Sequence, residues 1–311
     1  MIYVDAHCDT LTKIMELNTN LYENNCHVDL KRLKKYGSHV QFFAAFIEPV
    51  YCHAYAMKRA IQIIDRLYEE IKAYGEDISL CTSYEEIVST ASSHKVAALL
   101  SIEGGEALQG DLSALRMFYK LGVRSICLTW NHRNEIADGV SDSESGGGLT
   151  PFGREVVKNM NSLGMLVDVS HISERGFWDV LDISRAPVIA SHSNARKLCS
   201  HKRNLTDEQI LALSKNRGVM GINLYPFFLN DRGAASISEI IDHIEHIVGL
   251  AGIDCIGIGA DFDGVECTPE GIGGVQDMEK VFNELLKRNY SEDWIEKIAG
   301  GNFLRVIKEV F

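Results

Sequence analysis

The feature that most constrains the fold is an alternation of short apolar runs with longer amphipathic stretches. Eight runs have the length and composition of buried strands, at residues 2–6, 40–47, 96–102, 125–130, 165–169, 187–190, 219–224 and 255–259. Helix-like segments separate most of these runs, and two more helices are predicted at the end of the chain, at 277–289 and 291–309. Repeated βα units predict a parallel sheet, and eight of them can close into a (β/α)8 TIM barrel. We therefore predict such a barrel with extra C-terminal helices.

An open, doubly wound sheet is the alternative architecture. Its usual marker is a G-x-G-x-x-G turn directly after the first strand. That turn is missing here, and the segment "GIGADFDG" at 257–264 resembles it only loosely and belongs to the last unit. The 311 residues include only 5 prolines and no Gly/Ser/Pro-rich tract that would read as a linker. We therefore predict a single domain over residues 1–311, a length that barrels commonly reach.

The charge and the apolar content limit the possible partners. The formal net charge is −12, which disfavours binding to nucleic acid or to an anionic membrane surface. The longest apolar runs are strand-sized, whereas a membrane-spanning helix needs about 20 residues. The first residues lack the pattern of a secretory signal, and the 8 cysteines contain no C-x-x-C pair. We expect a cytoplasmic protein that binds neither nucleic acid nor a membrane.

Residues suited to a functional site follow most of the predicted strands at their C-terminal ends. They are His7, Asp9, Glu103, Trp130, Asn131, His132, His171, His192, Tyr225, Asp261 and Asp263. In a barrel these strand ends converge on one mouth, where active sites are built. Three imidazoles and several carboxylates in one pocket would be poorly satisfied without a cation. Because neutral imidazole and carboxylate oxygen suit zinc, the sequence predicts a metal site at the mouth.

The spacing of the predicted ligands indicates more than one ion. His7 and Asp9 are two residues apart on a predicted strand, so they share a face, while Cys8 points to the other side. The cluster offers more donors than one tetrahedral ion needs, and Glu103 could bridge two ions about 3.5–4 Å apart. A single buried histidine is more often a satisfied core residue than a ligand. The metal prediction therefore rests on the joint pattern, and we interpret the remote H-x-x-H pair of His243 and His246 as a solvated helix face.

Several longer motifs occur together and in a fixed order between Asp5 and Val265. They are "DAHCDT", "SIEGGEAL", "LTWNHRNEIADG", "GLTPFGREVVKNMNSLGMLVDVSHIS", "RAPVIASHSNAR", "KRNLTDEQI" and "IGIGADFDGV". With these motifs the chain resembles the renal (membrane) dipeptidase family of the amidohydrolase superfamily. The resemblance implies two zinc ions per chain, with His7 and Asp9 on the first zinc. It also implies that Glu103 bridges both ions and that His171 and His192 bind the second.

The resemblance also implies roles around the metal. Asp261 would take a proton from a bridging water and pass it on, which makes Asp261 and Glu103 the catalytic pair. Arg203, in "HKRN", would hold the terminal carboxylate of the substrate, and Tyr225 would line the substrate pocket. Trp130 stands where the animal enzymes of the family carry a histidine that steadies the carbonyl oxygen. His132, two residues on, is the remaining candidate for that contact.

The reaction implied by the resemblance is hydrolysis of dipeptides, including L-Xaa-D-Xaa, by a hydroxide held between two zinc ions. A soluble bacterial-type enzyme, with a homodimer as a possible assembly, fits the family. One alternative is another amidohydrolase acting on a lactone, a phosphotriester or a cyclic amide, although such relatives often bridge their metals with a modified lysine where Glu103 stands. A metal-dependent aldolase or isomerase would need a lysine at a strand end. A third alternative is a zinc-binding barrel without activity, which Trp130, in place of the family's histidine, leaves possible.

Overall fold

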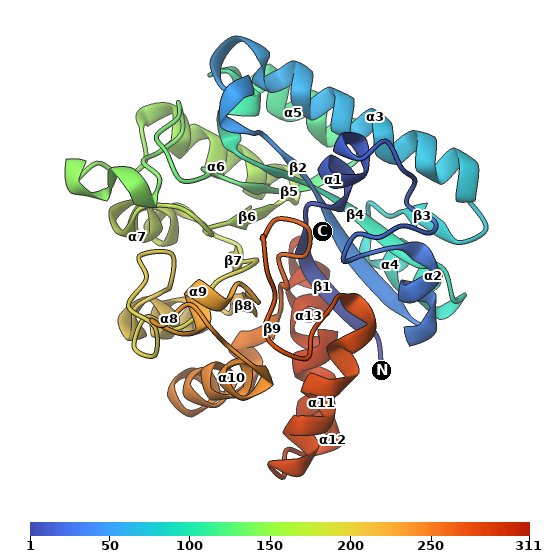
Figure 1. Cartoon of the computed structure of the whole chain (residues 1–311). Coiled ribbons are helices and arrows are strands. Elements are labelled where there is room, and N and C mark those ends of the chain that lie inside the picture. Colours follow the sequence, from blue (N-terminus) through green and yellow to red (C-terminus); the bar gives the residue numbers. More distant parts are fainter.

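The computed structural model describes residues 1–311, apart from the side chain of His53, and shows a parallel β-barrel surrounded by helices (Figure 1). The strands of the described chain are β1 (Tyr3–Cys8), β2 (His39–Phe46), β3 (Ile78–Leu80), β4 (Val96–Glu103), β5 (Val123–Cys127), β6 (Leu166–Asp168), β7 (Ile189–Ala190), β8 (Val219–Ile222) and β9 (Ile256–Ile258). Their parallel pairings run β1–β2–β4–β5–β6–β7–β8–β9 and return to β1, which closes the barrel. The predicted (β/α)8 barrel is confirmed.

The strand β3 lies outside the closed ring and was not predicted from the sequence. It pairs with Val96, Ala97 and Ala98 at the start of β4, while β5 pairs along the same edge of β4 from Leu100 onward. β3 is only three residues long, and two of these residues are half-buried. It therefore lacks the apolar run by which a buried barrel strand is identified in a sequence.

Helices lie between most of the strands, as the sequence predicted. They are α3 (Ala56–Tyr74), α4 (Tyr84–Ser92), α5 (Leu112–Lys120), α6 (Pro151–Leu163), α7 (Glu174–Ile183), α8 (Asp207–Lys215) and α10 (Ile237–Ala251). Local start signals account for several bounds: Thr206 and Gln209 form a capping box before α8, and Pro151 occupies the first turn of α6. Three short helices were not predicted, namely α1 (Thr10–Glu16), α2 (Leu30–Leu33) and α9 (Pro226–Leu229). Among the described residues, no helix combines the length and apolarity needed to cross a bilayer.

The last of the C-terminal helices covers the end of the barrel opposite the mouth. The C-terminal helices are α11 (Met278–Lys287), α12 (Glu292–Glu296) and α13 (Asn302–Val310), with a π-helical segment, Lys297–Gly301, between the last two. Phe303, Val306 and Ile307 of α13 pack in one buried apolar cluster with the first residues of several strands, such as Val4 and Val40. One end of the barrel is therefore filled by apolar side chains, and polar side chains can collect at the other end, where the strands finish.

Candidate metal centre and substrate cavity

A cavity of about 450 Å³ occupies the mouth of the barrel at the C-terminal ends of the strands. Its walls include most of the residues that the sequence predicted for the site, namely Asp9, Glu103, Trp130, His171, Arg203, Tyr225 and Asp261. His7 and His192 lie at the base of this cluster and are 2% and 0% exposed. The structure therefore brings residues from seven different strand ends into one largely buried group.

Glu103, the last residue of β4, lies at the centre of the cluster. Its Oε2 atom is 3.4 Å from Nε2 of His7, and its Oε1 atom is 2.9 Å from Nε2 of His171. The same Oε1 atom is 3.4 Å from Nε2 of His192, and Oδ2 of Asp9 is 3.4 Å from Nε2 of His7. Two of the three resulting groups of potential ligand atoms include Glu103, one with His7 and Asp9 and one with His171 and His192. The third group joins His7 and His192 to Asp261.

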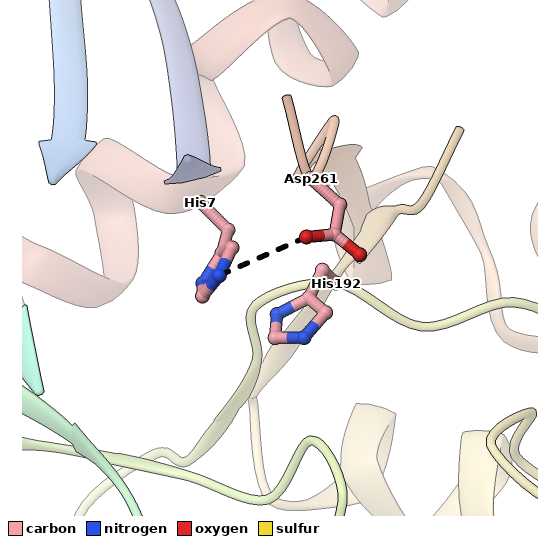
Figure 2. A group of neighbouring side chains, drawn as sticks. All are labelled: His7, His192 and Asp261. Atoms are coloured by element: carbon pink, nitrogen blue, oxygen red, sulfur yellow. Dashed lines mark ion pairs between the residues drawn. The ribbon is translucent and has the colours of Figure 1, made fainter. Parts of the chain in front are cut away.

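The general-base candidate Asp261 approaches the same centre from the loop after β9. Figure 2 shows its carboxylate directed toward His7 and His192, with Oδ1 3.9 Å from Nε2 of His7. The other oxygen, Oδ2, accepts a hydrogen bond of 2.8 Å from the side chain of Asn223. Asp261 has φ of 61°, a left-handed conformation that is uncommon outside glycine and that concentrates at functional sites. A Cβ atom at Gly264 would lie 2.5 Å from Oδ1 of Asp261, so glycine leaves that oxygen accessible.

Hydrogen bonds on the far side of two imidazoles fix which nitrogen faces the centre. Nδ1 of His171 lies 2.8 Å from the amide oxygen of Asn131, which can only accept, so Nδ1 carries the proton. Nδ1 of His192 lies 2.7 Å from the hydroxyl of Ser191, and that hydroxyl donates to Asp168. Both Nε2 atoms are therefore left with a lone pair directed into the cluster. Metal-binding histidines are oriented in the same way by hydrogen bonds to their second nitrogen.

The unsatisfied atoms of the cluster fit a bound cation. Nε2 of His171 and Nε2 of His192 lie 2.8 Å apart with both lone pairs facing each other, which is unfavourable without a shared positive charge. Nε2 of His7 and Oδ1 of Asp9 are buried without a hydrogen-bond partner. Burying such groups unpaired is costly, whereas a divalent cation would satisfy all of them at once.

The charges of the cluster indicate the same need for a cation. Burial, together with the nearby charge of Glu103, raises the pKa of Asp9 to about 7. Burial and the neighbouring Arg203 lower the pKa of His171 to about 3, which keeps it in the neutral form that binds metals. Burial alone would lower the pKa of His7, but Glu103 and Asp9 raise it well above its usual value. The carboxylates thus draw positive charge to this point of the structure.

One detail of the predicted ligand geometry is wrong. Asp9 does not lie on the strand with His7, because β1 ends at Cys8 and Asp9 is the N-cap residue of α1, with φ of −100° and ψ of 19°. Its carboxylate still meets His7 because the chain turns directly after the strand. Cys8 is fully buried in the apolar core between barrel and helices, on the side away from the cluster.

Arg203 is placed as a cation inside the cavity wall. It is 4% exposed, its Nη2 donates to the carbonyl oxygen of His192 at 3.0 Å, and its Nη1 donates to the hydroxyl of Ser193 at 3.5 Å. Its Nε atom is buried without a partner. Among the described residues no acidic side chain forms an ion pair with Arg203, and burial lowers its pKa. A buried guanidinium in this state can gain a carboxylate ligand at little further cost of desolvation.

The remaining predicted residues divide into two groups. Tyr225 and Trp130 line the cavity, both half-buried. His132 does not line it, because its side chain is 69% exposed and lies beside Asp142 at 3.6 Å. The interpretation of His243 as part of a solvated face is wrong, since it is buried and bonded to the backbone at Ala195 and Leu229.

Some functional residues were not found from the sequence. Asn131 stood at a predicted strand end, but its hydrogen bond to His171 had no sequence signal. Phe46 and Lys202 line the cavity, and Asn223 holds Asp261. The two hydrogen bonds, between Asn131 and His171 and between Asn223 and Asp261, join residues of different βα units. The local sequence therefore does not predict them.

The fold and the cluster together define a metal-dependent enzyme with its site at the mouth of a (β/α)8 barrel. The family model of membrane dipeptidases, peptidase family M19, matches residues 1–311, and the chain belongs to this family. The dipeptidase tcpJ of Claviceps purpurea is 35% identical over 297 residues, which cover 91% of this chain and 69% of that protein. The resemblance noted in the sequence is thereby confirmed, and the chain is a metallo-dipeptidase of this family.

Solved structures agree with this assignment. A metallopeptidase from Rhodobacter sphaeroides, liganded with a phosphinate mimic of the dipeptide L-Ala-D-Ala, superposes with a TM-score of 0.93 at 27% identity, covering 100% of this chain and 99% of that one. The dipeptidase AC, a metallopeptidase of family M19, has a TM-score of 0.93 at 28% identity and covers 100% of this chain and 98% of its own.

We predict that Asn131→Ala weakens metal binding by about 10- to 100-fold, because His171 loses the partner that orients its ring and tautomer. Asn131→Asp keeps the acceptor and should bind metal as the unaltered protein does, and Asn283→Ala, on the exposed face of α11, is a control. Competition with a chelator of known affinity measures the effect. Equal affinities for Asn131→Ala and the unaltered protein would show that this hydrogen bond does not support a metal ligand.

Proposed function

We propose that this chain is a zinc-dependent dipeptidase of the membrane-dipeptidase type that holds two zinc ions and hydrolyses dipeptides, L-Xaa-D-Xaa included. The observation that carries this proposal is the presence of two complementary features in one cavity. The cluster around Glu103 suits metal ions, and the buried Arg203 lacks an anion. A peptide with its free carboxylate close to its scissile bond would satisfy both features.

The described residues supply a ligand set for each proposed ion. His7 and Asp9 would hold the first zinc, His171 and His192 the second, and Glu103 would bind both, one oxygen toward each set. When bound, zinc lowers the pKa of water to about 7 and polarises a carbonyl group, which together make peptide hydrolysis feasible at neutral pH. The lone pairs fixed by Asn131 and Ser191 mean that His171 and His192 bind without first losing a proton.

Proton transfer is the proposed task of Asp261. One oxygen of its carboxylate is held by Asn223, which leaves Oδ1 directed toward the cluster. Burial raises the pKa of Asp261, with Glu103 adding to the effect, so the carboxylate is a better proton acceptor than an exposed aspartate. It would accept the proton of the attacking water and return it to the leaving amine, as general base and then general acid.

Arg203 would select the substrate by its carboxylate. Because two of its nitrogens are already bonded to His192 and Ser193, the guanidinium is fixed in place before substrate arrives. Charge-assisted bonds from such a fixed group to a carboxylate are strong and directional. The related Rhodobacter sphaeroides enzyme is liganded with a mimic of L-Ala-D-Ala, which supports a D-residue at the second position here. Tyr225, in the same wall, is the proposed neighbour of that residue. A cytoplasmic location, a single domain and a homodimer stay predictions from the sequence.

We expect Asp261→Asn to reduce kcat by about 10²- to 10⁴-fold on L-Ala-D-Ala and L-Ala-L-Ala while two zinc ions stay bound. The amide keeps the size of the side chain and the bond network near Asn223, but it cannot accept a proton. Asp293→Asn, on the exposed surface of α12, is the matched control. Steady-state kinetics and metal analysis by mass spectrometry give the two readouts. Full turnover in Asp261→Asn would contradict the role of this residue, and no turnover by the unaltered zinc protein on either dipeptide would contradict the proposed function.

We call Arg203 the carboxylate clamp, and its proposed role predicts two linked effects on substrate preference. The unaltered protein should cleave a free dipeptide at least about 10²-fold more efficiently, as kcat/KM, than the same dipeptide with a C-terminal amide, because the amide leaves Arg203 buried and unpaired. In Arg203→Met that preference should disappear, whereas Arg116→Met, exposed on α5, should keep it. A preference that survives in Arg203→Met would place carboxylate recognition elsewhere.

A further inference from the structure

Two aromatic rings form one wall of the substrate cavity beside the metal-binding cluster. Phe46 is the last residue of β2 and pairs in register with Glu103, and Trp130 follows the end of β5. Their ring centroids are 5.3 Å apart, and the indole is 6.2 Å from the ring of His171. Both are half-buried and line the cavity. We call Phe46 and Trp130 the aromatic pair; it lies over the end of β4, between β2 and β5.

Phe46, at the end of β2, lies across the mouth from Arg203, and Trp130, after the end of β5, packs against Phe46. In the closed ring β1–β2–β4–β5–β6–β7–β8–β9, the strand β7 lies opposite β2, and Arg203 is bonded to His192 at the end of β7. A dipeptide with its carboxylate on Arg203 and its scissile carbonyl at the cluster extends its N-terminal residue away from β7. That residue then lies on the side of Phe46 and Trp130. This placement rests on the proposed function.

The acidic residue beside Phe46 in the cavity wall is neutralised by an ion pair. Glu48, two residues after Phe46 and in the same wall, forms a two-pronged ion pair with Arg59, whose Nε donates to Oε2 of Glu48 at 2.8 Å. Arg59 is buried, and the pair neutralises the carboxylate. Beside Phe46 an apolar side chain therefore meets no unpaired charge, whereas a charged one gives up its hydration and finds only a pair that is already neutral.

Trp130 also separates two hollow spaces. It lines the substrate cavity on one side and, on the other, a second cavity of about 450 Å³ whose wall includes Cys52, Glu106 and Asn134. The indole thus gives the substrate cavity a flat apolar wall where it would otherwise open toward the buried carboxylate of Glu106. Flat aromatic faces favour contact with aromatic and branched apolar side chains.

We propose that the aromatic pair binds the side chain of the N-terminal residue and makes this enzyme selective for dipeptides that begin with an apolar, especially an aromatic, residue. Trp130 is the specificity-determining residue of this subsite. Its effect depends on the size and polarity of one substrate side chain and not on the peptide bond that is broken. The signature is therefore a change in the ratio of kcat/KM values between substrates.

The test compares kcat/KM for L-Phe-D-Ala, L-Leu-D-Ala, L-Asp-D-Ala and Gly-D-Ala in the zinc-loaded protein and in Trp130→Ala, Trp130→Phe and Trp294→Ala. The unaltered protein should prefer L-Phe-D-Ala over Gly-D-Ala by at least about tenfold, a ratio that a hydrophobic pocket readily supplies. Trp130→Ala should reduce that ratio at least about tenfold, and Trp130→Phe should keep most of it. Trp294, exposed on α12, is the control and should leave the ratio unchanged.

Each contrary result has a definite meaning. A Trp130→Ala protein that loses activity equally on all four dipeptides, or that gains activity on L-Phe-D-Ala relative to Gly-D-Ala, would overturn the subsite. So would an unaltered protein that prefers L-Asp-D-Ala or shows no preference. An unaltered protein that cleaves none of the four would instead overturn the proposed function. If Trp130→Ala does not fold, as judged by circular dichroism, the same ratio in Phe46→Ala decides the matter.

Discussion

The structure of the site depends on one shared carboxylate, that of Glu103. Burial would raise the pKa of this group, but His7, His171 and His192 outweigh burial and hold it well below its usual value. The carboxylate is therefore charged, and its two oxygens address imidazoles from different strands, 3.4 Å away on one side and 2.9 Å on the other. Every other predicted ligand takes its position relative to this group.

A charged group of this kind is stable only because the rest of the barrel is built to hold it. The end of the barrel near α13 is filled by apolar side chains such as Phe303, which is fully buried. That packing contributes stability that offsets the cost of collecting polar groups at the mouth. Backbone strain is also present there, since His171 and Asp261 both have positive φ, at 65° and 61°. Rigid strands carrying a strained, polar mouth are the arrangement expected of a preorganised catalytic site.

The sequence predicted site residues that stand at strand ends. It did not predict the contacts between residues of different βα units. Eight apolar runs predicted the ring of strands, and the residues after them included every residue of the proposed ligand set. β3 was not predicted because a three-residue strand with only one fully buried residue forms no recognisable apolar pattern. The position of Asp9 was misjudged because a strand that ends one residue early turns an i, i+2 pair into a strand residue and a helix cap. The hydrogen bonds from His171 to Asn131 and from Asn223 to Asp261 bring together residues about 40 positions apart, which only the fold reveals.

The central claim is that Glu103 joins two metal ions in one site, and anomalous X-ray diffraction of crystals of the zinc-loaded protein at the zinc edge tests it most directly. The account predicts two anomalous peaks about 3.5–4 Å apart, one between His7 and Asp9 and the other between His171 and His192, with Glu103 contacting both. A single peak, or peaks that Glu103 does not contact, would contradict it.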